Sequence, residues 1–155
     1  MSPLQTLARQ MDWAAANIAL NLDFIPDDKL RWKPAPTAPS SLEMVDHLLA
    51  VLGRMTPLVG GYLADEHTLQ PVENRDDAKA LLIEAAAGYS AMLRALKPSQ
   101  LDEIVETKMG QMPRRALAIM PVNDMIHHHG QIAYIQLMLG DTATHRDLSA
   151  LVNGK

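Results

Sequence analysis

The chain has 155 residues, 48% of them apolar, which is enough for a single domain with one hydrophobic core over residues 1–155. It has no cysteine, which excludes disulfides and thiolate metal sites, and its net charge of −4 with scattered basic residues argues against nucleic-acid binding. No apolar run reaches the length of a membrane span, and the first residues lack the pattern of a signal peptide, so we expect a soluble, cytoplasmic protein.

The first expected helix runs from about Pro3 to Leu22, because its apolar residues recur at helical spacing. These residues are Leu4, Leu7, Met11, Ala14 and Ile18. The following segment, residues 23–39, contains four prolines, which bar a continuous helix. We therefore expect an ordered crossover or a loop there.

A second helix is predicted to begin at Ser40, because Ser40 and Glu43 have the spacing of a capping box. We expect it to end near Gly60. Its apolar stripe consists of Met44, Leu48, Val51, Met55 and Leu58. One polar residue, His47, lies beside that stripe, and we expect its side chain to be buried or half-buried.

A third helix is predicted to begin after Asn74, with Asp76 and Asp77 in its first turn, and to end near Leu96. The side chains expected on its buried side are Ala78, Leu81, Ala85, Tyr89, Met92 and Leu96. Residues 97–119 carry no clear pattern. A connection of that length in a compact domain is usually functional or contains a short element.

The fourth helix is predicted to have Pro121 in its first turn and to stop at Gly140. Its apolar face consists of Met125, His128, Ile132, Ile135 and Leu139. From about Asp141 onward we expect a surface tail. Four such helices indicate an all-α fold, a four-helix bundle.

Two regions of the sequence bring potential metal ligands together. Three of the six histidines are consecutive, His127 to His129, and they cannot all face one place because neighbouring helical residues point about 100° apart. His128 falls on the inward face, and Asp124 lies one turn earlier on that face. With His47 from the second helix, they form a candidate site of two imidazoles and one carboxylate with open coordination positions.

Other interpretations of these residues remain open. A histidine on an apolar face is more often a hydrogen-bonded core residue than a ligand. His127 shares a face with Asp124 and Gln131, so it would replace His128 as ligand if the register shifted by one residue; otherwise His127 is a candidate general base. Gln131 is expected either to fix an imidazole tautomer or to form an interhelical hydrogen bond.

The remaining histidines are expected to lie outside the site. His129 points away from the inward face and is expected at the surface. His67 and His145 have no supporting neighbours in the sequence, which favours a structural role for both.

Two motifs resemble the DinB-like superfamily. Residues 30–34, Leu-Arg-Trp-Lys-Pro, precede a helix that carries His47, and the family has a Trp-x-Pro stretch before a helix with a histidine ligand. Residues 127–132, His-His-His-Gly-Gln-Ile, are similar to the family pattern His-x-x-x-His-Arg-Gly-Gln. The resemblance spans nearly the whole chain and implies a four-helix bundle with long crossover connections.

Carried over residue by residue, the family's first histidine ligand falls on His47 and the histidine before Arg-Gly-Gln falls on His128. The arginine position is His129 here, and the remaining ligand position falls on Asp124, which departs from the family pattern. An aspartate can ligate zinc, nickel, manganese or iron. The departure therefore leaves metal binding possible and the identity of the divalent metal open.

The resemblance also implies a class of chemistry. Relatives in the family look like metal-dependent transferases or isomerases that use a small thiol, and a hydrolase with the metal as Lewis acid is the related possibility. A chain without cysteine would take a low-molecular-weight thiol from solution. The expected partners are a small-molecule substrate and a second copy of the chain in a homodimer. The alternatives are a non-catalytic bundle that binds a metal or small ligand, or a dimeric bundle with a degenerate metal site.

Overall fold

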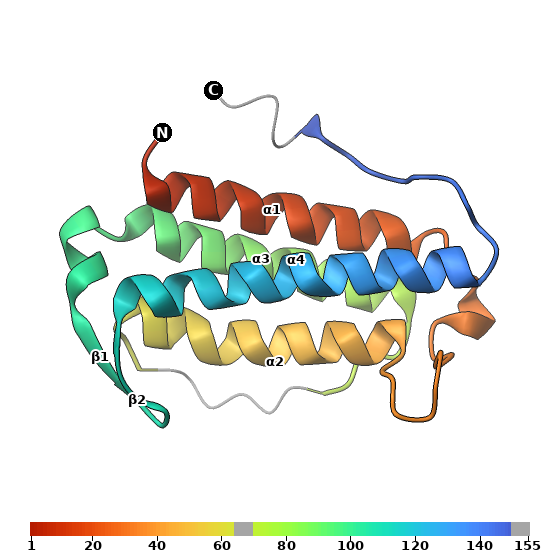
Figure 1. Cartoon of the computed structure of the whole chain (residues 1–155), viewed down its shortest axis with the longest axis horizontal. Helices are drawn as coiled ribbons and strands as arrows, with labels where there is room; N and C mark the ends of the chain where they lie inside the picture. Colours follow the sequence, from red (N-terminus) through yellow and green to blue (C-terminus); the bar gives the residue numbers. More distant parts are fainter. Residues whose placement is uncertain (64–69, 150–155) are drawn as a thin grey trace.

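Four helices lie side by side in the computed structural model, which describes residues 1–63 and 70–149 (Figure 1). They are α1 (Pro3–Leu22), α2 (Ser41–Gly60), α3 (Arg75–Ala95) and α4 (Arg114–Met138). Shorter elements are the 3-10 helices η1 (Asp27–Lys29) and η2 (Pro98–Asp102), and the antiparallel strands β1 (Ile104–Thr107) and β2 (Gly110–Pro113). The predicted all-α bundle is confirmed, with a two-stranded hairpin added to it.

The order of the helices in space explains the long connections. The main contacts join α1 to α3 and α4, and α2 to α3 and α4, so α1 and α2 are diagonal to one another, as are α3 and α4. Helices α1 and α4 run in one direction and α2 and α3 in the other (Figure 1). Because α2 and α4 are neighbours that come from distant parts of the sequence, side chains from both can meet between them.

The core is built from the apolar stripes of all four helices. The stripe expected for α1 is buried apart from the half-buried Leu7. On α3 the prediction is wrong by one residue at two positions: Leu82 and Ala86 are buried, whereas the side chain of Leu81 is 44% exposed and Ala85 is only half-buried. Residues 81–83 and 85–87 are apolar throughout, so periodicity could not decide which row faces inward.

In the described ranges no helix is long and apolar enough to cross a membrane.

A capping box starts α2, as predicted. The backbone N–H of Glu43 donates to Ser40 Oγ at 3.3 Å, and the N–H of Ser40 donates to Glu43 Oε2 at 2.8 Å. The other carboxylate oxygen of Glu43 lies 2.7 Å from Lys33 Nζ. This local network fixes where α2 begins and so where His47 falls along the bundle.

The capping box predicts a pH-dependent contribution to stability. The hydrogen bond from Lys33, with that from the Ser40 backbone, lowers the pKa of Glu43 from 4.5 to about 2. Because the folded pKa is the lower one, this contribution is present above pH 4.5 and is lost as the pH falls towards 2. We expect Glu43→Gln to lower the free energy of unfolding near neutral pH but not near pH 2, as measured by urea unfolding at both values. An equal loss at both values would contradict this assignment.

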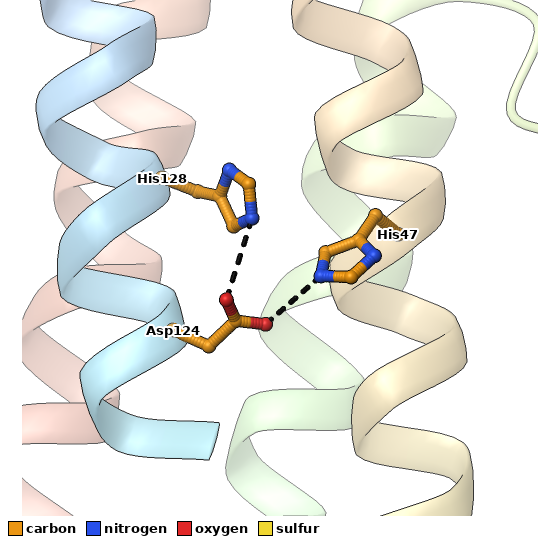
Figure 2. A group of neighbouring side chains, drawn as sticks. All are labelled: His47, Asp124 and His128. Atoms are coloured by element: carbon orange, nitrogen blue, oxygen red, sulfur yellow. Dashed lines mark hydrogen bonds and ion pairs between the residues drawn. The ribbon is translucent and has the colours of Figure 1, made fainter. Parts of the chain in front are cut away.

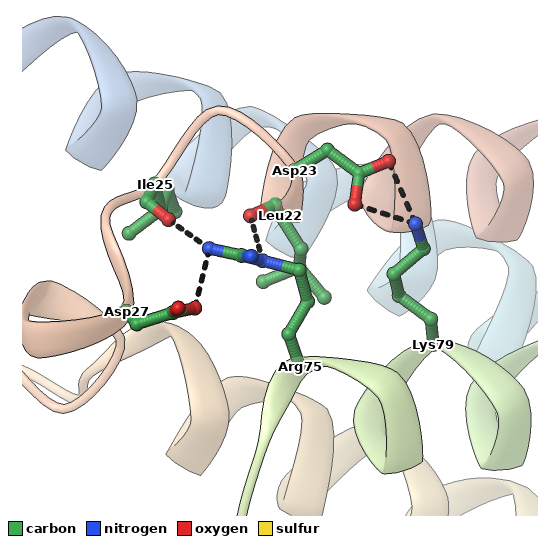
Figure 3. A network of polar contacts seen from close by, with 6 residues as sticks. All are labelled: Leu22, Asp23, Ile25, Asp27, Arg75 and Lys79. Carbon is green, nitrogen blue, oxygen red and sulfur yellow. Dashed lines mark hydrogen bonds and ion pairs between the residues drawn. The ribbon is translucent and has the colours of Figure 1, made fainter.

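Arg75, at the start of α3, holds the connection that follows α1 (Figure 3). Its Nε donates to the carbonyl of Leu22 at 3.0 Å, and its Nη2 donates to the carbonyl of Ile25 at 2.5 Å. The same Nη2 lies 2.8 Å from Asp27 Oδ1. The predicted crossover is therefore ordered by these side-chain contacts together with the short 3-10 helix η1.

Helix α4 begins at Arg114, seven residues before Pro121, so the prediction that Pro121 lies in the first turn is wrong. Pro121 has no backbone N–H, so the helical hydrogen bond to the carbonyl of Leu117 is missing. Leu117 and Pro121 are both buried, and their packing in the core offsets this loss. The buried Arg114 donates to the carbonyl of Val59 on α2 and to Glu103 Oε2. These contacts fasten the start of α4, and the hairpin before it, to the end of α2.

The segment after α4, residues 139–149, lies mostly exposed at the surface, as predicted, and is bound along α1 (Figure 1). The carbonyl of Asp147 accepts hydrogen bonds from Trp13 Nε1 at 2.8 Å and from Asn17 Nδ2 at 2.9 Å. Asn21 Nδ2 donates to the carbonyl of His145 at 3.1 Å. Asn17 and Asn21 are buried, which the apolar stripe of α1 did not indicate.

Candidate metal centre

The three predicted ligands lie together where α2 faces α4 (Figure 2). His47 projects from α2, and Asp124 and His128 lie one turn apart on α4. Asp124 Oδ2 is 3.0 Å from His47 Nε2, and Asp124 Oδ1 is 3.4 Å from His128 Nε2. Each residue offers one ligand atom, and these atoms all lie within 4.8 Å of one another.

These distances fit a small divalent ion. Nitrogen and oxygen ligands lie about 2.0–2.1 Å from zinc, so two donors in a tetrahedral site are separated by about 3.4 Å. The two nitrogen-to-oxygen distances, 3.0 Å to Asp124 Oδ2 and 3.4 Å to Asp124 Oδ1, are close to that separation, although they involve different oxygens of the carboxylate. Two imidazoles and one carboxylate would hold the ion on one side and leave its other positions open.

His47 is exposed, with 49% of its side-chain surface accessible, so the prediction of a buried or half-buried residue is wrong. The core face of α2 is formed by Val45, Leu49 and Leu52 together with Leu48, whereas His47 belongs to a neighbouring row that opens to solvent. This exposure leaves the coordination side of its imidazole accessible from outside.

His128 is largely enclosed, and one of its ring nitrogens contacts Gln131. Only 12% of its side-chain surface is exposed, and its Nδ1 lies 2.6 Å from Gln131 Oε1. Because an amide oxygen accepts hydrogen bonds, this contact favours the tautomer with the proton on Nδ1, in which Nε2 is the nitrogen able to bind a metal. Burial lowers the pKa of His128 against the opposing effect of Asp124, which favours the neutral imidazole that a metal binds. Among the described residues, Gln131 thus contacts an imidazole of its own helix and forms no interhelical hydrogen bond, as the first of its two predicted roles requires.

Gln131→Ala should weaken zinc binding by about 10-fold to 100-fold, because a ligand imidazole without its outer partner loses its preferred tautomer and orientation. Competition against a chromophoric chelator measures this affinity. Gln131→Glu keeps an acceptor at the same position and should bind zinc more tightly than the alanine variant. An unchanged affinity in Gln131→Ala would show that this hydrogen bond does not organise the centre.

His127 lies beside the centre but outside the cluster of donor atoms. Its side chain is exposed, and its ring centroid is 5.1 Å from that of His128. The structure therefore has the register in which His128, not His127, faces Asp124 and His47. This position suits a group that exchanges protons with a bound molecule.

His129 is buried, with 7% of its surface exposed, so the prediction of a surface residue is wrong. Its ring meets that of Trp13 edge-on at 5.3 Å between centroids, and burial, followed by the charge of Arg146, lowers its pKa. Helix α4 is rotated relative to the prediction, so that His129 faces α1 while His128 lies at the edge towards α2. His145 pairs with Asp141 at 2.8 Å, away from the centre, and His67 lies outside the described residues.

The centre lies at one end of an open cleft of about 1180 Å³. Its lining residues are His47, Val51, Arg54, Met55 and Leu58 of α2, Glu106, Thr107, Lys108 and Met109 of the hairpin, and Met120, Asn123, Asp124 and His127 of α4. Three elements therefore bound the space in front of the predicted ligands, and the apolar row of α2 beyond His47 forms one wall.

The hairpin wall was missed because residues 97–119 could not be assigned from the sequence. A signal was present: β-branched residues occur at Ile104, Val105 and Thr107, and Gly110 follows them at a turn. Gly110 has a φ of 106°, a backbone conformation that favours glycine. The pattern was too short to distinguish a strand from a loop.

Comparison with known proteins identifies the family of the chain. A family model described as the DinB superfamily matches residues 10–132. The chain belongs to the DinB superfamily. The resemblance inferred from residues 30–48 and 127–132 is thereby confirmed. A search of curated proteins found no match.

Two solved structures share the fold of this DinB superfamily chain. A DinB-like protein of Bacillus subtilis aligns with a TM-score of 0.72 at 20% identity, over 90% of this chain and 96% of that one. A conserved protein of Enterococcus faecalis aligns with a TM-score of 0.69 at 17% identity, over 91% of this chain and 99% of that one. At these identities the likeness concerns the fold alone.

Proposed function

We propose that this chain is a metal-dependent enzyme of the DinB type, which binds a divalent transition metal through His47, Asp124 and His128. The observation that carries the proposal is a group of three donor atoms within 4.8 Å of one another, in which two of the residues, His47 and Asp124, line an open cleft. A purely structural ion would be enclosed by protein ligands, whereas a catalytic one keeps positions open for substrate. The exposed His47 and the adjoining cleft favour the catalytic arrangement.

The side chains around the centre have separate proposed roles. Asp124 contributes the negative charge that offsets a divalent ion, and His128 is held by Gln131 with its Nε2 free to bind. When bound, the ion supplies a Lewis acid that lowers the pKa of a thiol or water molecule coordinated to it. His127, exposed on the cleft wall beside His128, is placed to accept the released proton.

The substrate class follows from the same elements. The family resemblance implies transfer or isomerisation with a small thiol, and this is the reaction we propose. Since the chain has no cysteine, the reacting thiol would come from a small molecule in solution. The cleft has room for such a thiol together with an electrophile. Hydrolysis would use the same ion and the same base.

Zinc-loaded protein should accelerate the reaction of a small thiol, such as 2-mercaptoethanol, with 1-chloro-2,4-dinitrobenzene. His127→Gln should lower kcat by about 100-fold, because a positioned general base contributes roughly 100-fold or more. The measurement is the absorbance of the thioether product, with the zinc content determined for each variant. The zinc content of His127→Gln should be unchanged, since His127 lies outside the donor cluster.

Two outcomes would change the proposal. Full zinc loading without any acceleration for thiols or for activated esters would leave a bundle that binds metal without catalysis. An unchanged kcat in His127→Gln would remove the role of His127 as base and leave the metal proposal intact.

A further inference from the structure

Two cations in the cleft have no partner within the part of the chain that the structure describes. Arg54 of α2 and Lys108 of the β1–β2 turn both line the cleft, and neither makes an ion pair or side-chain hydrogen bond to a described residue. Arg75, Arg94 and Arg114, by contrast, are each paired with a carboxylate. The positive charge of Arg54 and Lys108 is therefore available to a ligand.

Two carboxylates, Asp124 and Glu106, line the same cleft, but neither forms an ion pair with Arg54 or Lys108. Asp124 is engaged with the imidazoles of His47 and His128. Glu106 accepts a hydrogen bond from Gln111 Nε2 at 2.5 Å. A ligand that complements the cleft therefore carries a negative charge near Arg54.

The distance from Arg54 to the metal centre is set by α2. Arg54 follows His47 by seven residues, which places the two on the same face, separated along the axis by about 10 Å. Val51 and Met55 lie on the same cleft wall, and Met120 of α4 lines the cleft with them. The surface that joins the two polar ends is thus formed by aliphatic and thioether side chains, which bind hydrocarbon.

We propose that the cleft binds an amphipathic carboxylate, with its carboxylate on Arg54, its apolar body along Val51 and Met55, and its other end facing the metal centre. The identification of that other end as the reacting end rests on the function proposed above. Lys108, exposed at the turn between β1 and β2, adds positive charge at the same cleft. Arg54 is thus a residue that determines specificity for substrate charge.

Octanoate is the probe for this proposal, because its chain is about as long as the separation along α2, and octan-1-ol and octylamine are its neutral and cationic counterparts. Each is titrated calorimetrically into the full chain as purified. We expect octanoate to bind most tightly and octylamine least tightly. Arg54→Gln should weaken octanoate binding by about 10-fold to 100-fold, the loss expected for one charge-assisted hydrogen bond, and leave octan-1-ol binding unchanged.

Matched variants separate this effect from a general effect of charge. Arg94→Gln also removes one arginine, but Arg94 pairs with Asp12 between α3 and α1, away from the cleft, so octanoate binding should not change. Lys108→Gln should weaken octanoate binding in the same direction as Arg54→Gln. Equal affinities for octanoate and octan-1-ol, no binding of either, or an equal loss in Arg94→Gln would overturn the proposal.

The same titrations, repeated after treatment with a chelator, test the carboxylate site at Arg54 separately from the proposed metal centre. The preference for octanoate should persist without metal and in His47→Ala, because Arg54 is not part of the centre. A preference that depends on added zinc and survives in Arg54→Gln would mean that the carboxylate binds the ion, which overturns the assignment to Arg54. Absence of zinc binding with a preserved octanoate preference would reject the metal proposal alone.

Discussion

His128→Ala should lower the affinity for zinc by more than about 100-fold. Removal of a residue that is only hydrogen-bonded to a metal ligand already lowers metal affinity by about 10-fold to 100-fold, and removal of the ligand itself should cost more. The reason is geometric: among the described residues His128 is one of three that supply a donor atom, and its Nε2 lies 3.4 Å from Asp124 Oδ1. Zinc stoichiometry by elemental analysis, and affinity by chelator competition on untagged protein, measure the effect.

The neighbouring residue provides the control for this variant. His127→Ala removes an imidazole from the same turn of α4 but leaves the donor cluster intact, so it should bind zinc as the unaltered protein does. Similar losses in both variants would point to nonspecific binding by the three consecutive histidines. Loss in His127→Ala alone would mean that α4 presents the other register to the metal.

Leu82→Ala should lower the free energy of unfolding by about 2–5 kcal/mol, the range for removal of a fully buried leucine side chain. Leu82 is fully buried on α3, with no exposed surface. Leu81→Ala makes the same chemical change one residue earlier, where the side chain is 44% exposed, and should change the free energy by no more than about 0.5 kcal/mol. Urea unfolding of the two variants, followed by circular dichroism, measures both values.

This pair tests the rotation of α3 in the bundle. Equal losses in the two variants, or a larger loss in Leu81→Ala, would mean that the row predicted from the sequence faces the core. The helix content alone would not reveal such an error, since both rows belong to the same helix.

The ends of the helices could be predicted where the chemistry is local. Ser40 caps α2 and Asn74 caps α3, and each side chain accepts a hydrogen bond from the backbone N–H three residues later. Such a cap depends on local sequence alone, so it can be predicted without knowledge of the rest of the fold. The start of α4 was misplaced because it depends on distant groups. Arg114 is held by the carbonyl of Val59 and by Glu103, and that packing allows Pro121 to lie inside the helix.

In the candidate site, too, the features set by local sequence could be predicted, and those set by distant groups could not. Asp124 and His128 could be paired from the sequence because helical geometry brings residues four apart onto one face. The burial of His47 and His129 could not be predicted, because the rotation of each helix about its own axis is decided by its neighbours. Likewise, Arg54 became a candidate only when the hairpin closed the cleft around its side of α2.

The central claim, that a divalent metal is bound between α2 and α4, is tested most directly by anomalous diffraction at the zinc edge from crystals of zinc-loaded protein. The account predicts a peak within bonding distance of His47 Nε2, an oxygen of Asp124 and His128 Nε2. A peak only at other histidines, such as His145 with Asp141, or no peak in the presence of excess zinc would contradict it.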